Sequence, residues 1–446
     1  MKKILITLPY YYNFRNFFMT GFIENLSKDF ELHVVLPQEI MEEHSLVEKY
    51  PKIEFHEIVF SNKRIVDRLL FNLLKSRIQY LQNTYTYRIK RSSAKSLSER
   101  IKLLLLSLPF PRSKYLFRSL RNLYGFLLSN SQVKVFIEEL KPDLLINTQA
   151  HWNLEHFYKK YADYHGVKSL NIVHSWDVIT TKGAFLFDYT TVIVWNRVNR
   201  LEYHYFVDRL NGFQSNVKEI GPLQFDPYFV NRPQAGDLKR EYGINTNQKV
   251  LLYATSVERL VPSEMKIVDM LISLVQEVDD LFLVVRLHPQ RATELEENKS
   301  IKGKNYYIDS SQNKSSSTLD NASFSDDFFD NLIQQMTISD AVINVASTMT
   351  LDALCFKKPV IQIAFDAEES KYSESVKRYY QYDHFKNLVG STKSIHMAYS
   401  FEELSELAIA LSKGKLQGGS GLEWMIDQLG TSSVKLTETI KKEILA

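Results

Sequence analysis

Short runs of apolar and β-branched residues recur along this chain of 446 residues, and longer amphipathic stretches separate most of them. The first series lies at residues 4–8, 31–36, 53–60, 144–147, 169–173, 192–195 and 217–220. The second lies at residues 250–254, 281–287, 305–308, 341–345 and 360–363, with a further candidate at 394–397. Buried strands that alternate with helices are typical of parallel α/β sheets. The sequence therefore predicts an α/β protein with two such sheets.

The length also favours two domains, because a single hydrophobic core stops growing below this size. Residues 221–243 are rich in turn formers and lie between the two series of strands. We therefore expect a Rossmann-like domain at residues 1–225 and a second one at 226–420. A final helix within residues 421–446 is expected to return to the first domain, and the polar stretch 310–321 is expected to be a mobile loop.

A basic, helical insertion at about residues 64–130 interrupts the first series of strands. From Lys63 to Arg121 there are 15 lysines and arginines against two acids, a balance of +13, in a chain whose net charge is +3. Cationic amphipathic helices suit an anionic membrane surface, although a solvated helical pair packed on its own domain explains the pattern equally well. Nucleic-acid binding is less favoured, because no motif for it accompanies the charge.

Other features bear on the compartment. No window approaches the roughly 20 apolar residues that span a bilayer, and the apolar start of the chain lacks the features of a signal peptide. The single cysteine, Cys355, cannot form an intrachain disulfide. We expect a cytoplasmic protein that associates with the inner face of a membrane, if at all, only peripherally.

The stretch 339–353 carries the strongest functional signal in the second domain. A predicted buried strand is followed by Ser347 and Thr348 at the start of a helix, with Asp352 about one turn further on. Free backbone N–H groups at such a helix start bind phosphate oxygens, hydroxyl groups add donors, and a carboxylate suits a ribose diol. The alternative is an ordinary helix cap.

Two other strand ends of this domain carry phosphate-compatible groups. Arg286 and His288 end one strand, while Thr255 and Arg259 follow another. Ligands of open α/β sheets collect at the carboxyl ends of the strands. A strand that simply ends in a proline and a capped histidine is the alternative for the first of these pairs.

In the first domain, residues 171–183 follow a predicted strand. Asp177, beside Trp176, is suited to take a proton from an acceptor hydroxyl, and His174 is suited to the same task. Lys182 is suited to hold an anionic group of the donor or the acceptor, and Trp176 is expected to contact the acceptor. The alternative is a structural loop in which Trp176 packs in the core and Asp177 caps a helix.

The order of these segments resembles the GT-B glycosyltransferases. Within them it resembles the branch of the CDP-glycerol glycerophosphotransferases of teichoic acid synthesis and related bacterial surface-polysaccharide transferases. The matching pieces are residues 174–183, in place of a Trp-His-Gly-Thr-Pro-x-Lys segment, and residues 252–255, 286–289 and 339–366. The resemblance implies two Rossmann-like domains that face a central cleft. It also implies that His288, Ser347 and Thr348 contact the donor diphosphate and that Asp352 takes the ribose.

Two departures favour sugar transfer over polyol-phosphate transfer. Asp177 follows the tryptophan where the polyol enzymes have their proposed basic histidine, and residues 344–348 replace an Asp-Tyr-Ser-Ser segment. No Asp-x-Asp motif ends a strand, so we expect no metal and no cofactor. The expected activity is metal-independent transfer from a nucleotide sugar to a glycan or lipid-linked acceptor, with a carboxylate base. A CDP-glycerol-type transferase, a sugar-nucleotide epimerase and a noncatalytic sugar-nucleotide-binding protein are the alternatives.

Overall fold

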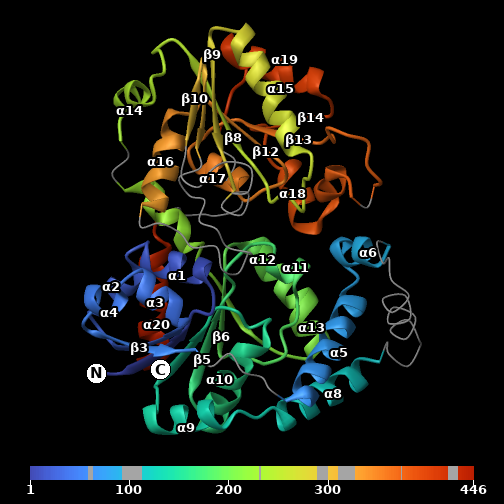
Figure 1. The fold of residues 1–446 in the computed structure, drawn as a ribbon. Helices are drawn as coiled ribbons and strands as arrows, with labels where there is room; N and C mark the ends of the chain where they lie inside the picture. Colours follow the sequence, from blue (N-terminus) through green and yellow to red (C-terminus); the bar gives the residue numbers. More distant parts are fainter. Residues whose placement is uncertain are drawn as a thin grey trace. The chain divides into compact units, whose positions relative to one another are not determined.

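The chain divides into two compact units. The computed structural model describes residues 1–58, 64–92, 113–230, 233–288, 300–309, 327–372, 374–419 and 430–445. Unit 1 comprises Met1–Gln224 together with Thr431–Ala446, and unit 2 comprises Phe225–Gly430. Each unit is built on a seven-stranded sheet (Figure 1). The predicted mobile loop at 310–321 lies outside the described residues.

The sheet of unit 1 is parallel throughout, in the order β3-β2-β1-β4-β5-β6-β7. Its strands are β1 (Lys3–Thr7), β2 (Glu31–Leu36), β3 (Ile53–Glu57), β4 (Leu144–Asn147), β5 (Lys168–Ile172), β6 (Thr191–Val194) and β7 (Asn216–Glu219). Each overlaps one predicted run of the first series. The central strands are buried on both faces, which is why they were apolar enough to be recognised.

Helices cover both faces of this sheet. The first part of the unit contributes α1 (Tyr11–Phe18), α2 (Phe22–Leu26), α3 (Gln38–Glu43) and α4 (Leu46–Lys49). Between β3 and β4 lie α5 (Ile65–Gln82), α6 (Tyr85–Ser92), α8 (Lys114–Leu127) and α9 (Ser131–Leu140), followed after β4 by α10 (Asn153–Tyr164). Apolar side chains of α5, α8, α9 and α10 form one core with Leu5, Val35 and Leu145 of the sheet. The described parts of the predicted insertion in the first domain are thus helical, and residues 93–112 of it lie outside the described residues.

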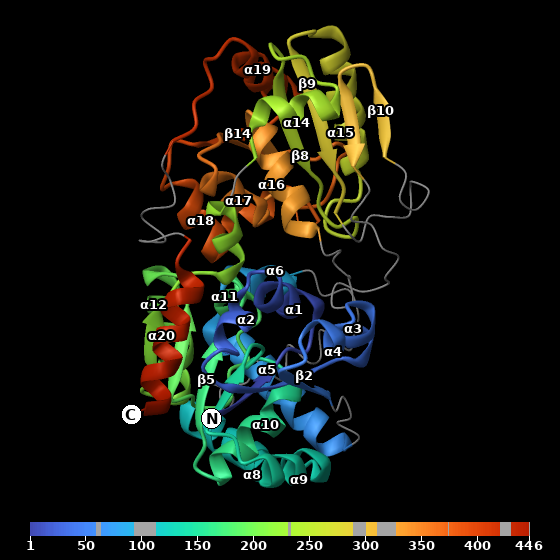
Figure 2. The same cartoon turned by 90° about the vertical axis from the view of Figure 1, so that its left-hand side faces the viewer.

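The last helix, α20 (Ser432–Leu445), belongs to unit 1 although unit 2 precedes it in the chain (Figure 2). The Glu443 carboxylate accepts hydrogen bonds from Thr191 Oγ1 and Lys218 Nζ, each at 2.8 Å. Lys168 Nζ donates to the Glu443 backbone carbonyl at 2.9 Å. The helix is therefore fixed to β5, β6 and β7. The remaining short elements of the unit are α11 (Val178–Thr181), α12 (Arg197–Glu202), the π-helix η2 (Tyr203–Asp208) and α13 (Arg209–Asn211).

Unit 2 has the sheet order β10-β11-β9-β8-β12-β13-β14. Its strands are β8 (Lys249–Ala254), β9 (Leu281–Arg286), β10 (Ile301–Gly303), β11 (Tyr306–Asp309), β12 (Ala341–Asn344), β13 (Val360–Ile363) and β14 (Ile395–Ala398). All pair in parallel except β10, which forms an antiparallel hairpin with β11. The sequence did not predict β10, because this three-residue edge strand has no buried side chain and so leaves no apolar run.

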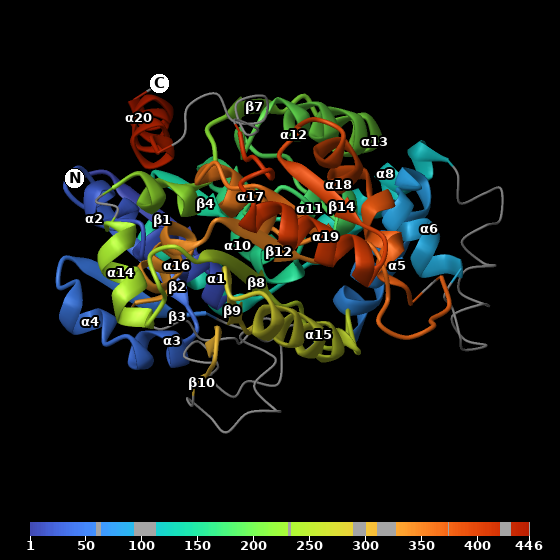
Figure 3. The ribbon, with the colours of Figure 1, turned by 90° about the horizontal axis from the view of Figure 1, so that it is seen from above.

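Helices cover both faces of this sheet as well. On one face, α15 (Glu264–Glu277) and α19 (Phe401–Ser412) pack in a common core with β8 and β9. On the other lie α14 (Ala235–Tyr242), α16 (Phe328–Ile338) and α17 (Met349–Cys355), as the view from above shows (Figure 3). The 3-10 helices η3 (Leu223–Phe229) and η6 (Val376–Gln381) and the helix α18 (Asp383–Val389) complete the described elements.

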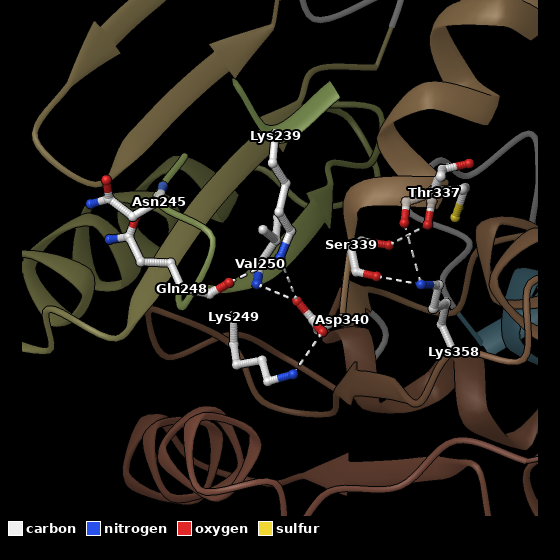
Figure 4. Close-up of polar contacts among 10 residues, drawn as sticks. Lys239, Asn245, Gln248, Lys249, Val250, Thr337, Ser339, Asp340 and Lys358 are labelled. Carbon is white, nitrogen blue, oxygen red and sulfur yellow. Dashed lines mark hydrogen bonds and ion pairs between the residues drawn. The ribbon is translucent and has the colours of Figure 1, made fainter. Parts of the chain in front are cut away.

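Polar contacts fix the amino end of β12 (Figure 4). The Asp340 carboxylate accepts from the Val250 backbone N–H at 2.9 Å and from Lys249 Nζ at 3.1 Å, and Lys239 Nζ lies 3.5 Å from it. Lys358 Nζ donates to the Ser339 carbonyl at 2.6 Å. Because these contacts set the register of β12, they also determine where the turn at its other end lies.

The predicted fold class is confirmed, since both units are α/β with parallel sheets and the first carries the helical insertion. Among the described residues, no helix is both long and apolar enough to cross a membrane.

Candidate functional site

Each sheet has one point at which the strand order reverses direction. In unit 1 it lies between β1 and β4, and in unit 2 between β8 and β12. Ligands of open α/β sheets bind outside the carboxyl ends of the strands at such points. The two carboxyl edges are therefore the candidate sites, one in each unit.

At the edge of unit 1, His174 follows β5 and lies in a group of rings. Its ring is 5.0 Å from the ring of Tyr12 and stacks at 5.6 Å on that of His151. His174 Nδ1 lies 3.3 Å from the Thr148 carbonyl oxygen. A carbonyl only accepts, so Nδ1 must carry the proton in this contact and Nε2 presents a lone pair. In this tautomer Nε2 is the nitrogen that can accept a proton.

The surroundings of His174 favour its neutral form. Burial and the nearby Lys182 ammonium lower its pKa to about 3. Burial also takes the pKa of His151 well below its ordinary value, and the charges of His174 and Lys182 act in the same direction. Lys182 therefore lies close enough to the two rings to offer a positive charge to an anionic ligand beside them.

The two other predicted residues of this loop have structural partners. The Asp177 carboxylate accepts from Ser175 Oγ at 2.5 Å and from Thr181 Oγ1 at 3.1 Å, so it organises the turn into α11 while remaining partly exposed. Trp176 is buried at 3% exposure, and its carbonyl accepts from Asn199. Its position differs from the acceptor contact that we expected, because the indole packs in the interior.

Sequence reasoning missed Glu155, which lies beneath this edge on α10. Its carboxylate accepts from Thr7 Oγ1 at 2.6 Å and from the backbone N–H groups of Thr148 and Gln149 at 2.9 and 2.6 Å. Burial raises its pKa to about 7, and these donors oppose the rise. Glu155 thus joins the end of β1 to the loop after β4. The signal in the sequence was an acid in the first turn of a helix that follows a buried strand.

At the edge of unit 2, the turn after β12 uses most of its own amides. The N–H of Ala346 donates to Gln362 Oε1 at 3.0 Å, that of Ser347 to Asn344 Oδ1 at 3.1 Å, and that of Met349 to Ser347 Oγ at 3.3 Å. The expectation of a row of free amides is therefore wrong for these three residues. The Thr348 amide makes no hydrogen bond to a described residue, and the Ser347 hydroxyl, which accepts from Met349, can still donate outward.

Arg286 and Asp352 lie in the interior of unit 2. Arg286 is 7% exposed, donates to Asn331 and Gln335, and lies 3.7 Å from Asp309 Oδ2. Asp352 is 5% exposed and accepts from Tyr228 Oη at 2.6 Å. Both side chains were expected to face the donor. They are buried instead, because helices whose positions the sequence did not predict pack over them.

Thr255 and His288, which were predicted to follow two strands of this unit, lie next to each other at this edge. Thr255 Oγ1 accepts from the His288 backbone N–H at 2.9 Å, which ties the ends of β8 and β9. The His288 side chain is partly buried, and residues 289–299 lie outside the described part of the chain.

Arg259 lines a cavity of about 390 Å³ together with Arg378. The walls come from residues 259–263 after β8, residues 365–370 after β13, and the segment that leads into η6. Arg378 Nη2 donates to Tyr379 Oη, which in turn donates to the Leu260 carbonyl at 3.1 Å. Sequence reasoning missed Arg378, whose only signal was its place in an Arg-Tyr-Tyr run. The carboxylates of Asp366, Glu368, Glu369 and Glu374 line the same cavity. Asp366 accepts from Ser375 and from the Val376 N–H, and Glu368 pairs with Lys266. The two guanidinium groups are the part of the wall that is suited to bind an anionic group.

Solved structures of similar fold cover nearly the whole chain. They include the S. aureus MnaA–UDP co-structure (TM-score 0.55, 12% identity, 99% of this chain and 96% of that one). Another is the UDP-GlcNAc 2-epimerase of Methanocaldococcus jannaschii in complex with UDP-GlcNAc and UDP (TM-score 0.51, 10% identity, 99% of each chain). A third is the glycotransferase of kitacinnamycin (TM-score 0.50, 10% identity, 99% of each chain).

No family model and no curated protein sequence matches the chain. The structural likeness shows the fold, which is the GT-B-like fold of glycosyltransferases and sugar-nucleotide epimerases. It does not single out the CDP-glycerol branch.

Proposed function

We propose that this protein is a nucleotide-sugar-dependent glycosyltransferase. Unit 2 would hold the donor, and unit 1 would hold a surface-glycan or lipid-linked acceptor and deprotonate its hydroxyl group. The observation that carries the proposal is the cavity of about 390 Å³ with Arg259 and Arg378 in its wall, at the carboxyl edge of a GT-B-like unit. Its volume lies in the range of ligand pockets, and its two guanidinium groups suit a diphosphate.

The departing diphosphate gathers negative charge as the glycosidic bond breaks. We propose that Arg259, Arg378, His288 and the hydroxyl groups of Ser347 and Thr348 stabilise that charge. These residues supply the positive charge that a metal ion supplies in other transferases, so we propose metal-independent transfer.

For the base we favour His174 over Asp177. The Thr148 carbonyl sets the tautomer of His174, which leaves Nε2 as the nitrogen that can accept a proton. Asp177, whose carboxylate accepts two hydroxyl groups, would hold the loop in shape. Lys182 would bind an anionic group of either substrate.

The basic insertion supports a lipid-linked acceptor. Exposed apolar residues on the neighbouring helices α5 and α8 accompany the positive charge, and we call them the α5–α8 face. They are Ile65, Val66, Leu69, Leu73, Tyr115, Leu123 and Phe126. Apolar side chains among exposed cations suit an anionic membrane surface. We therefore propose peripheral association with the cytoplasmic face of a membrane.

The first test is thermal unfolding of the protein with CMP, CDP, UDP, GDP and dTDP. A nucleotide at about 100 times its Kd should add about 2.7 kcal/mol of stability. We expect one of them to raise the Tm, and Arg259→Ala and Arg378→Ala to abolish the shift. Arg240→Ala, an exposed arginine of α14 paired with Asp237, is the matched control. No shift with any nucleotide would contradict the donor assignment.

The products then separate the reaction classes. A glycosyltransferase releases a nucleoside diphosphate from a nucleotide sugar only when an acceptor is present, whereas transfer of a polyol phosphate from a CDP-polyol releases CMP. An epimerase is the second candidate, since one of the similar structures is that of a UDP-GlcNAc 2-epimerase. Epimerisation of the sugar at one carbon, in a nucleotide sugar and without any acceptor, would favour the epimerase.

A further inference from the structure

A second group of chemically reactive side chains lies on the two outer strands of unit 1, apart from the loop that carries His174. His33 is on β2, and Glu54 and His56 are on the edge strand β3. In the parallel register His33 pairs with Glu54, and Val35 pairs with His56. Because side chains alternate along a strand, His33, Glu54 and His56 point to the same face of the sheet.

The potential ligand atoms of these residues converge. His33 Nδ1 lies 3.1 Å from His56 Nε2 and 3.4 Å from a carboxylate oxygen of Glu54. One ligand atom from each residue lies within 4.8 Å of the other two. The ring of His56 packs at 4.9 Å against Phe136 of α9, which limits its movement.

Glu31 fixes the orientation of His33. His33 is 3% exposed, and its Nε2 lies 3.0 Å from the Glu31 carboxylate. A carboxylate accepts, so Nε2 carries a proton in its contact with Glu31. Nδ1, which faces Glu54 and His56, is then the nitrogen that a metal ion would take in place of a proton. A carboxylate that holds the far nitrogen of a histidine is the usual outer partner of a histidine bound to a metal.

We propose that His33, Glu54 and His56 bind a divalent transition-metal ion of the zinc class. Ligands about 2.0–2.1 Å from a tetrahedral ion lie about 3.3 Å apart, close to the two separations centred on His33 Nδ1. Two imidazoles with one carboxylate suit Zn²⁺ or Co²⁺ rather than Mg²⁺ or Ca²⁺, which prefer oxygen ligands. A water molecule or another ligand would take the fourth position.

Such an ion would link the edge strand β3 to β2 in unit 1. Its free energy of binding would add to the free energy of folding of this unit, since the unfolded chain does not preform the site. The site takes no part in the proposed transfer, so the test of metal binding does not depend on that function.

The test is a titration of the full, tag-free chain, first freed of metal with a chelator, with Co²⁺. We expect one equivalent of Co²⁺ to produce the visible absorption of a low-symmetry site. Zn²⁺ should displace it, and Mg²⁺ should not. Saturation with Zn²⁺ should raise the Tm by several degrees.

Two variants locate the ion, His56→Gln and Glu54→Gln, because Glu54 is exposed and His56 is only partly buried. Each should weaken Co²⁺ binding at least tenfold, and Glu31→Gln should weaken it about 10-fold by releasing His33. The control is His165→Gln, since His165 pairs with Glu138 elsewhere in unit 1. Absence of the absorption in the wild type, or wild-type affinity in both His56→Gln and Glu54→Gln, would overturn the proposal.

Discussion

The tautomer of His174 is the residue-scale feature on which the proposed chemistry depends. Among the described residues, the hydrogen-bond partner of Nδ1 is the Thr148 carbonyl oxygen, so Nε2 is the nitrogen that the ring presents as a base. We expect His174→Gln to lower the turnover of the transfer reaction by about 10²–10⁴-fold, the range for loss of a general base, with nucleotide affinity unchanged. Steady-state kinetics with a saturating donor measures this.

Asp177→Asn is the companion variant of this experiment. An amide can still accept from Ser175 and Thr181, so we expect a smaller loss. If Asp177→Asn abolishes turnover while His174→Gln does not, the carboxylate is the base, as the sequence alone suggested.

Glu155 gives a prediction about pH and stability. Burial raises its pKa from 4.5 to about 7, so between these values the folded protein keeps a proton that the unfolded chain releases. The contribution of protonated Glu155 to the unfolding free energy is complete below pH 4.5 and is lost as the pH rises through 7. In the wild type, the unfolding free energy should therefore fall by an amount on the order of 3 kcal/mol between pH 4.5 and 7. In Glu155→Gln this fall should be absent.

Urea unfolding at several pH values measures this slope. The control is Glu139→Gln, because Glu139 is an exposed glutamate of α9. Parallel pH profiles for the wild type and Glu155→Gln would show that Glu155 is ionised in the folded protein throughout this window.

At this scale the sequence predicted which residues follow the strands but not which way they point. His174, Thr255 and Arg259 lie at the carboxyl edges. Arg286, Asp352 and Trp176 lie in the interior, because helices distant in the sequence pack over them and supply polar partners. Arg378 and Glu155 become visible as site residues only when the fold brings separate segments together.

At the scale of elements, strands were predictable because burial on both faces makes them apolar. The edge strand β10 was not, for the opposite reason. The turn after β12 was predicted in position, but the partners of its amides were not. Asn344 is a local partner on β12, whereas Gln362 comes from β13 and could be placed only once the two strands pair.

The helix α20 gives a prediction at the same scale. Glu443 is the acceptor for Thr191 and Lys218, so Glu443→Ala leaves two polar groups without their partner. We expect a loss of about 1–2 kcal/mol in unfolding free energy, measured by urea denaturation. Glu438→Ala, an exposed glutamate of the same helix, should leave stability unchanged. An equal loss in both variants would mean that the effect comes from helix propensity.

At the scale of the molecule, the α5–α8 face predicts binding to vesicles that contain anionic lipid. Leu69 and Phe126 are 61% and 80% exposed. The double variant Leu69→Ser/Phe126→Ser should bind such vesicles about tenfold more weakly in a sedimentation assay. Val434→Ser, which replaces an exposed apolar residue of α20, is the control. Equal binding by all three proteins would contradict the proposed membrane association.

The position of α20 also bears on how the protein is made. The ribosome synthesises the first 224 residues of unit 1 before unit 2. The contacts of β5, β6 and β7 with Glu443 can form only after that residue has left the exit tunnel. Domains generally fold as they emerge, the N-terminal one first. Here the N-terminal unit instead reaches its final form after unit 2 has been synthesised. A nascent chain stalled within unit 2 would therefore hold unit 1 in an incomplete state that chaperones can recognise.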